Sequence, residues 1–323
     1  MLCYQVHAFI FLSFFIAFPS TNATFPTIYV NPSGEGNFTT IQAAIDSVPA
    51  YNKRWTCIHI ERGLYREQIR IPYDKPFIYL RGQGERKTYV VWDAHDSTST
   101  SATFTSQADN TIAKYITFIN SYNSHPISKN KPMRPAVAAM IQGDKSVFHR
   151  CGFFGLQDTL WDEHGRHYFR SCSIKGAVDF IFGAGQSLYE GCTISVVARA
   201  LKGPGYITAQ GRSHAQDTNG FVFKNCNIGG NGKTFLGRPW RDYARVVFYN
   251  TSMSSVVVPQ GWDARVGLED RPTFAEHNCR GVGSNTSRRV KWLKKLSERD
   301  LNYLTSISFI DDDGWMNKLP FNL

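Results

Sequence analysis

A cysteine-centred motif that recurs at nearly regular spacing constrains the fold of this 323-residue chain most strongly. The four copies read HRCGFFG, RSCSIKG, EGCTISV and KNCNIGG, and their cysteines lie at positions 151, 172, 192 and 226. Each copy has a polar residue, Cys, a polar or small residue, and then an apolar residue. Similar strand-like stretches lie at 114–121 and 245–253. Short strands at intervals of about 20 residues indicate a solenoid, whose turns must stack because none buries its inner face alone.

One turn of a parallel β-helix is about this long, so we predict an all-β fold of that kind. The composition agrees, because aromatic residues reach 14% while charged residues stay at 19%. The stretch FTTIQAAIDSVP predicts a short N-terminal capping helix, which begins after Thr39 or Thr40 and ends before Pro49. The C-terminal part is more polar, and we expect irregular segments there.

The same register makes a prediction about the cysteines. Stacked strands lie about 4.8 Å apart, and this spacing falls inside the Cα–Cα window of roughly 4.4 to 6.8 Å for a disulfide. We therefore predict a disulfide between Cys172 and Cys192 on neighbouring turns. The alternative is a ladder of reduced, buried cysteines, and the sequence leaves the states of Cys57, Cys151, Cys226 and Cys279 open.

The N-terminus indicates secretion. An apolar run from Ala8 to Phe18 has the length of a signal-peptide core and is followed by small polar residues. We predict a signal peptide at 1–23 and a single domain at 24–323, located outside the cell; an uncleaved anchor is the alternative. The secretory route also predicts N-glycosylation at the N-x-S/T sites, which are Asn22, Asn37, Asn250 and Asn285.

The formal net charge is +10, with the densest basic run at 288–299. A secreted protein rarely meets nucleic acid, so an acidic extracellular polymer is the better partner. For the basic run itself we expect a solvated amphipathic helix.

One carboxylate stands in an apolar run, GAVDFIFGAG, where Asp179 is flanked by Val178 and Phe180. An unpaired charge in such surroundings is costly. Asp158, in GLQDTLW, lies 21 residues earlier, the same interval that separates Cys151 from Cys172. If the cysteines stack, the two aspartates stack as well.

Two adjacent carboxylates do not both ionise freely, so one carries a proton while the other stays charged. This is the arrangement of an acid and a nucleophile or base. Arg238, in FLGRPW, offers the cation that selects the charged member, and Gln157 offers an amide donor for an oxyanion. The alternative is that the two acids are ordinary turn residues.

These segments carry a resemblance to a known family. GLYREQI, GLQDTLW, GAVDFIFGAG, YITAQGR and FLGRPW occur in this order and resemble the signature segments of plant pectinesterases (pectin methylesterases). The resemblance extends from TIYVNPSGEGNFTTIQAAI to the closing GWMN. It implies a right-handed parallel β-helix with a carboxylate active site, and no metal or cofactor. It also implies the form of the family without the N-terminal inhibitor-like region.

The resemblance implies roles for individual residues. Asp179 would attack the methyl ester of a galacturonosyl residue, and Asp158 would protonate the departing methanol and later activate water. Arg238 would hold Asp179, Gln157 would stabilise the oxyanion, and Trp240 would stack on the sugar. Thr103 matches a position that contacts substrate in the family. The expected partners are pectin (methylated homogalacturonan) and a proteinaceous pectinesterase inhibitor, with no nucleic acid and no membrane after signal cleavage, and the chain is expected to be a monomer.

One substrate-contact position departs from the family. The family usually carries a second oxyanion-donating Gln where this chain has Pro135, in PAVAAM. Proline has neither a side-chain donor nor a backbone N–H. The resulting alternative is a weak or inactive pectin-binding wall protein on the same scaffold; a polygalacturonase or pectate lyase is a more distant one. The pair His164 and His167 has a metal-compatible spacing, for which we expect a surface or structural role instead.

Overall fold

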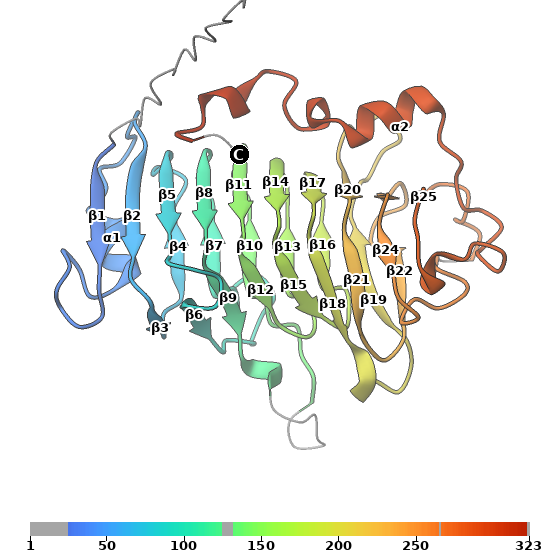
Figure 1. The fold of residues 1–323 in the computed structure, drawn as a ribbon, viewed down its shortest axis with the longest axis horizontal. Helices are drawn as coiled ribbons and strands as arrows, with labels where there is room; N and C mark the ends of the chain where they lie inside the picture. Colours follow the sequence, from blue (N-terminus) through green and yellow to red (C-terminus); the bar gives the residue numbers. More distant parts are fainter. Residues whose placement is uncertain (1–24, 125–131, 265, 322–323) are drawn as a thin grey trace, which may run out of the picture.

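The computed structural model describes residues 25–124, 132–264 and 266–321. Three sheets of parallel strands run side by side along the molecule (Figure 1). From β2 to β24, hydrogen-bonded neighbours within a sheet are separated in sequence by one strand of each of the other two sheets, so each of these turns contributes one strand to each sheet. This confirms the predicted parallel β-helix.

The ten-stranded sheet consists of β1 (Thr27–Val30), β2 (Thr56–Ile60), β5 (Ile78–Arg81), β8 (Thr111–Lys114), β11 (Ser146–His149), β14 (Arg166–Arg170), β17 (Gln186–Glu190), β20 (Gly220–Lys224), β23 (Arg245–Tyr249) and β25 (Thr273–His277). The seven-stranded sheet consists of β4 (Ile69–Ile71), β7 (Phe104–Ser106), β10 (Ala139–Ile141), β13 (Leu160–Asp162), β16 (Ile181–Gly183), β19 (Gly205–Gln210) and β22 (Thr234–Pro239). The eight-stranded sheet consists of β3 (Gly63–Tyr65), β6 (Thr88–Trp92), β9 (Thr117–Asn120), β12 (Gly152–Phe154), β15 (Ser173–Gly176), β18 (Thr193–Val197), β21 (Asn227–Asn231) and β24 (Ser252–Met253).

An aromatic ladder fills the interior along the ten-stranded sheet. Rings on successive strands stack nearly parallel at centroid separations of 4.9, 4.5, 4.5 and 4.6 Å. The rings belong to Phe148, Phe169, Tyr189, Phe223 and Phe248, all of which are fully buried. Stacked aromatic pairs contribute about 0.5–1.5 kcal/mol each beyond the burial of their area. The ladder therefore fixes the register in which the turns stack.

The repeated cysteines occupy equivalent places on successive turns, as Gly152↔Ser173 and Ser173↔Thr193 pairing shows. The structure nevertheless holds Cys172 and Cys192 as free thiols, so the predicted disulfide is not present in it. Each thiol donates a hydrogen bond to a backbone carbonyl of the preceding turn, at 3.3 and 3.4 Å. In a regular ladder, each cysteine has an equivalent neighbour on the turn before it and on the turn after it. The structure therefore matches the alternative prediction, a ladder of reduced, buried cysteines.

The N-terminal helix α1 (Ile41–Ser47) forms where the sequence predicted it. The Thr40 side chain caps it by accepting a hydrogen bond from the Ala43 backbone N–H. Ile41, Ala44 and Ile45 are buried against the first turns of the solenoid.

The C-terminal segment, coloured red in Figure 1, runs back across the outer face of the ten-stranded sheet. It contains α2 (Glu298–Thr305), whose Leu301 and Leu304 join the apolar contacts on that face. The helix predicted over 288–299 is wrong for most of that run, because only its last two residues are helical. Arg289 is instead buried and forms a two-point ion pair with Glu276 at 2.7 and 2.9 Å.

The described helices are all too short or too polar to cross a lipid bilayer. The predicted signal peptide and the sequon at Asn22 lie outside the described residues. Of the other sequons, Asn37 and Asn285 are exposed and Asn250 is half-buried, and their glycosylation stays a prediction.

Candidate active site

The two aspartates singled out by their spacing lie on adjacent turns in matching register. A parallel bridge joins Gln157 to Val178, and Leu160 pairs with Ile181. Asp158 and Asp179 fall between these pairs, one turn apart, and the Asp158 backbone N–H donates to the Val178 carbonyl at 3.0 Å. The register inferred from the cysteine repeat is therefore correct at the site.

Both aspartates have left-handed backbone conformations, with φ of 57° at Asp158 and 46° at Asp179. Each forms the corner at which the chain turns from the eight-stranded sheet into a strand of the seven-stranded sheet. Aspartate tolerates this conformation better than most side chains. The corner geometry thus repeats from one turn to the next and carries a carboxylate on both.

Arg238, on β22, reaches Asp179 from two turns away. Its Nε donates to Asp179 Oδ1 at 2.9 Å, and its Nη2 donates to Oδ2, so the pair is bidentate. The Asp179 side chain is 15% exposed and that of Arg238 is 42% exposed. A two-point, charge-assisted contact of this kind fixes the orientation of the carboxylate.

Asp158 has a different electrostatic environment. No described residue donates a side-chain hydrogen bond to its carboxylate. Burial, followed by the repulsion from Asp179, raises the pKa of Asp158 to about 7, and Arg238 opposes this only in part. Near neutral pH the site therefore presents one proton donor next to one oriented carboxylate.

A cleft of about 300 Å³ opens over Asp179 and Arg238, and the half-exposed indole of Trp240 forms part of its wall. Phe182 packs edge-on against Trp240 at 5.9 Å and stacks on Trp161 at 5.2 Å. These three rings make an apolar surface beside the carboxylates, suited to the face of a sugar ring.

The sequence analysis did not identify Trp161 and Phe182. Each lies three residues after one of the aspartates, in QDTLW and VDFIF, so the signal was the shared spacing from Asp158 and Asp179. Pairing of Trp161 with Phe182 across β13 and β16 places both on the outer face of the seven-stranded sheet.

Tyr206 and Asp263 support Arg238 and were also not identified from the sequence. The guanidinium of Arg238 lies over the Tyr206 ring, 4.3 Å from its centroid. The Tyr206 hydroxyl donates to Asp263 Oδ2 at 2.8 Å, and its ring stacks on Phe235. A cation over an aromatic face and a carboxylate behind it keep the arginine charged and in place.

Comparison with known proteins identifies the family. The profile of the family described as Pectinesterase matches residues 27–313. Probable pectinesterase 29 of Arabidopsis thaliana is 57% identical over 300 residues, which cover 91% of this chain and 89% of the relative. Probable pectinesterase 55 of the same plant is 55% identical, covering 92% of each.

The chain belongs to the pectinesterase family. A solved structure agrees with this, since the pectin methylesterase from carrot superposes with a TM-score of 0.84 at 30% identity, covering 93% of this chain and 98% of the carrot enzyme.

Two further positions of this pectinesterase, Thr103 and Pro135, were predicted to contact substrate. Thr103 is fully buried, and its hydroxyl donates to the Ile119 carbonyl at 2.9 Å, so the structure does not support a substrate contact there. Pro135 lies one turn before Gln157, because the backbone N–H of Ala136 donates to the Gln157 carbonyl at 3.2 Å. Position 135 is therefore next to the predicted oxyanion donor, but it supplies no donor of its own.

The histidine pair divides into a surface and a structural residue, as expected. The His164 side chain is 65% exposed. His167 is fully buried, with Nδ1 2.5 Å from Asp162 Oδ1 and Nε2 2.9 Å from the Gly143 carbonyl. Tyr189 donates to the other Asp162 oxygen at 2.6 Å. Within the described ranges, no group of three or more His, Cys, Asp or Glu side chains is arranged to hold a metal ion.

Proposed function

We propose that this pectinesterase hydrolyses the methyl esters of galacturonosyl residues in pectin, releasing methanol and leaving carboxylates on the polymer. The observation that carries the proposal is the unequal pair in the cleft. Asp179 is bound at two points by Arg238, while burial and the neighbouring Asp179 charge raise the pKa of Asp158 to about 7. Membership of the pectinesterase family supports the methyl ester groups of pectin as the substrate.

In the first half of the reaction, an oxygen of Asp179 attacks the ester carbonyl and forms a tetrahedral intermediate. The intermediate collapses when the bond from carbon to the methoxy oxygen breaks, and Asp158 gives its proton to that oxygen. Methanol leaves, and Asp179 remains joined to the sugar as an acyl-enzyme. Protonated Asp158 is suited to this step because its pKa lies near neutrality.

In the second half, Asp158 is a carboxylate and accepts a proton from water as the water attacks the acyl carbon. Collapse of this second intermediate releases the galacturonate carboxyl group and returns Asp179 to its ionised form. Arg238 stabilises that leaving carboxylate through the same two hydrogen bonds that orient it beforehand.

Gln157 is the proposed donor to the oxyanion, and it precedes the acid Asp158 directly. Removing one oxyanion donor costs about 10²–10³ in rate in other hydrolases. With Pro135 in the second position, this enzyme depends on Gln157 more heavily than a relative with two donors. Trp240, supported by Phe182, provides the surface on which the sugar stacks.

A catalytically weak pectin-binding protein is the second candidate, and Pro135 is the observation that favours it. Methanol release from methylated pectin separates the two. The wild type should release methanol, and Asp179→Asn should reduce the rate by about 10³-fold or more. Asp46→Asn, an exposed change of the same kind that creates no N-x-S/T site, is the matched control. Absence of release from folded wild-type protein, with pectin binding retained, would establish the binder instead.

We further propose that the protein is secreted and acts in the cell wall, after removal of residues 1–23. The apolar N-terminal run and the exposed sequons at Asn37 and Asn285 support this route. Mass spectrometry of the extracellular protein would test both the new N-terminus and the glycans. The monomeric state and a protein inhibitor stay predictions.

A further inference from the structure

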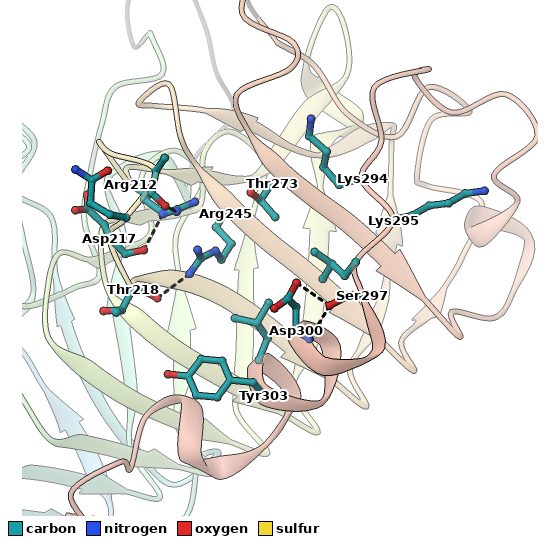
Figure 2. Close-up of a pocket in the computed structure, with 14 residues that line it drawn as sticks. Arg212, Asp217, Thr218, Arg245, Thr273, Lys294, Lys295, Ser297, Asp300 and Tyr303 are labelled. Atoms are coloured by element: carbon teal, nitrogen blue, oxygen red, sulfur yellow. Dashed lines mark hydrogen bonds between the residues drawn. The ribbon is translucent and has the colours of Figure 1, made fainter.

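A pocket larger than the cleft over Asp179 lies elsewhere on the molecule. It has a volume of about 570 Å³ and lies where β20, β23 and β25 begin, under the segment that leads into α2 (Figure 2). None of the residues that line it also lines the cleft. Its size falls within the roughly 300–1,000 Å³ usual for ligand sites.

Two arginines form one side of this pocket, and each is held by backbone carbonyls instead of carboxylates. Arg212 is 3% exposed and donates to the carbonyls of Ala215, Asp217 and Tyr243. Arg245 donates to the Thr218 carbonyl at 2.8 Å, as Figure 2 shows. Within the described residues, neither guanidinium has a carboxylate within ion-pair distance.

The two charges disfavour one another. Burial, and next the nearby Arg212, lower the pKa of Arg245 to about 10. Burial also lowers the pKa of Arg212. Two neighbouring, partly desolvated cations that form no direct ion pair are costly, and an anion that enters the pocket would offset that cost.

Lysines continue the positive surface on the opposite side of the pocket. Lys294 donates to the Asp270 carbonyl at 2.6 Å, and Lys295 is exposed; neither forms an ion pair with a described residue. Two carboxylates also line the pocket. Asp217 accepts from the His214 backbone N–H, and Asp300 accepts from the Ser297 hydroxyl, so both are partnered within their own loops. The lining thus includes four cations, of which the two lysines extend outward at the rim, and two engaged anions.

The pocket continues into smaller ones on either side. A 400 Å³ pocket shares Lys294, Lys295 and Leu296 with it, and a 330 Å³ pocket shares Thr218 and Tyr303. The Tyr303 side chain is 46% exposed and presents an aromatic surface at the edge of the hollow. A row of connected hollows with an aromatic edge suits an extended sugar chain better than a single small ion.

Gln210 connects this region to the cleft. Its side-chain oxygen accepts hydrogen bonds from the backbone N–H groups of Arg212 and Arg245, at 2.9 and 2.8 Å. Its backbone carbonyl accepts from the Trp240 N–H at 3.0 Å. The cleft and the basic pocket therefore lie on two sides of the turn that leads from the seven-stranded sheet to the ten-stranded sheet.

We propose that the basic pocket is a second binding site for the acidic galacturonan chain, specific for stretches whose carboxylates are free. This inference rests on the proposed function for the identity of the polyanion, since the reaction converts neutral esters into carboxylates. Guanidinium groups recognise carboxylates in a planar, two-point manner. A product stretch held here keeps the enzyme on the same polymer while the cleft acts on neighbouring esters.

The test is calorimetric titration with a fully de-esterified oligogalacturonate of defined length. The double variant Lys294→Gln/Lys295→Gln should lose one class of binding sites or weaken it about tenfold. The control Arg86→Gln/Lys87→Gln makes the same change in net charge on an exposed turn away from the pocket and should bind as the wild type does. Trp240→Ala should weaken the other class, which belongs to the cleft.

Equal isotherms for the pocket variant and its control would overturn the proposal. So would equal affinity of the pocket for a sulfated dextran of the same length, because this would mean a general polyanion surface. The measurement needs no ester hydrolysis. Failure of the proposed function would appear separately, as a lack of methanol release from the wild type.

Discussion

Two aspartates stand at opposite ends of one short strand, and their surroundings differ sharply. Asp158 precedes β13, lies one turn before the cleft residue Asp179, and receives no side-chain hydrogen bond from the described residues. Asp162 ends β13 and is fully buried, with His167 on one oxygen and Tyr189 on the other. Gly185 makes room for it, because a Cβ there would lie 2.1 Å from Asp162 Oδ1.

The comparison teaches how burial acts on a carboxylate. Partners satisfy Asp162, so its burial holds three turns of the solenoid together. Burial of Asp158 is uncompensated and is reinforced by the Asp179 charge, so it raises the pKa of Asp158 to about 7. One strand thus carries a structural carboxylate and a reactive one.

The largest expected effect comes from Asp158→Asn. We expect kcat for methanol release to fall by about 10²–10⁴, because the proton donor and acceptor is lost. The thermal unfolding temperature should stay the same or rise, since the change removes a desolvated acid. Asp46→Asn, which is exposed and creates no N-x-S/T site, serves as the control. A large loss of stability would mean that Asp158, like Asp162, has a structural role.

Asp162→Ala, in contrast, should lower the stability of the protein. Removing one partner of a buried ionic network costs about 3–5 kcal/mol, because His167 and Tyr189 then lack an acceptor. Urea unfolding measures the effect, with Asp96→Ala as the exposed control. If the unfolding free energy changes by less than about 0.5 kcal/mol, the proposed division between the two ends of β13 is wrong.

The pH dependence distinguishes the two aspartates further. An ordinary aspartate has a pKa of about 3.9, and that of Asp158 is raised to about 7. The folded state therefore holds this proton more tightly than the unfolded state, and stability falls as pH rises from about 4 to about 7. The gap in unfolding temperature between Asp158→Asn and the wild type should widen across this window and stay constant above it.

The same titration limits the rate. Above about pH 7, methanol release by the wild type should decline about tenfold per pH unit as Asp158 loses its proton. A rate that is flat from pH 7 to 9 would remove Asp158 from the role of acid. The rate is measured as kcat/KM, with methylated pectin well below KM and at constant ionic strength, because this quantity reports the pKa of the enzyme without substrate.

Pro135→Gln should have the smallest effect. A donor next to Gln157 would add to oxyanion stabilisation, but a glutamine side chain has more rotamer freedom to lose than proline. We expect a rise in kcat of about fivefold, well below the full value of an oxyanion donor. Pro135→Ala is the control and should leave kcat unchanged. Equal rates for both variants would show that the position does not reach the oxyanion.

The sequence predicted the elements of the fold that depend on repetition. The interval of 21 residues placed Asp179 beside Asp158 because a solenoid converts spacing along the chain into adjacency. The spacing also predicted correctly that the cysteines stack on successive turns. It gave no reason for a disulfide between Cys172 and Cys192, because each cysteine has an equivalent neighbour on either side.

Features that depend on contacts between distant turns were not predictable in this way. The network of Asp162, His167 and Tyr189 needs the register of three turns at once. Arg289 lies in a run that resembles a solvated helix, yet Glu276 draws it into the interior. Thr103 matched a motif but is buried, because strand position and not residue type decides exposure.

Helix α1 has a consequence for solubility. Parallel strands continue through their free backbone groups, so a solenoid end can recruit another copy and grow into a filament. By placing Ile41, Ala44 and Ile45 over the first turns, the helix closes the apolar lumen at that end. The seven residues of α1 thereby act as a terminator of self-assembly, in a protein whose architecture sets no limit on its own length.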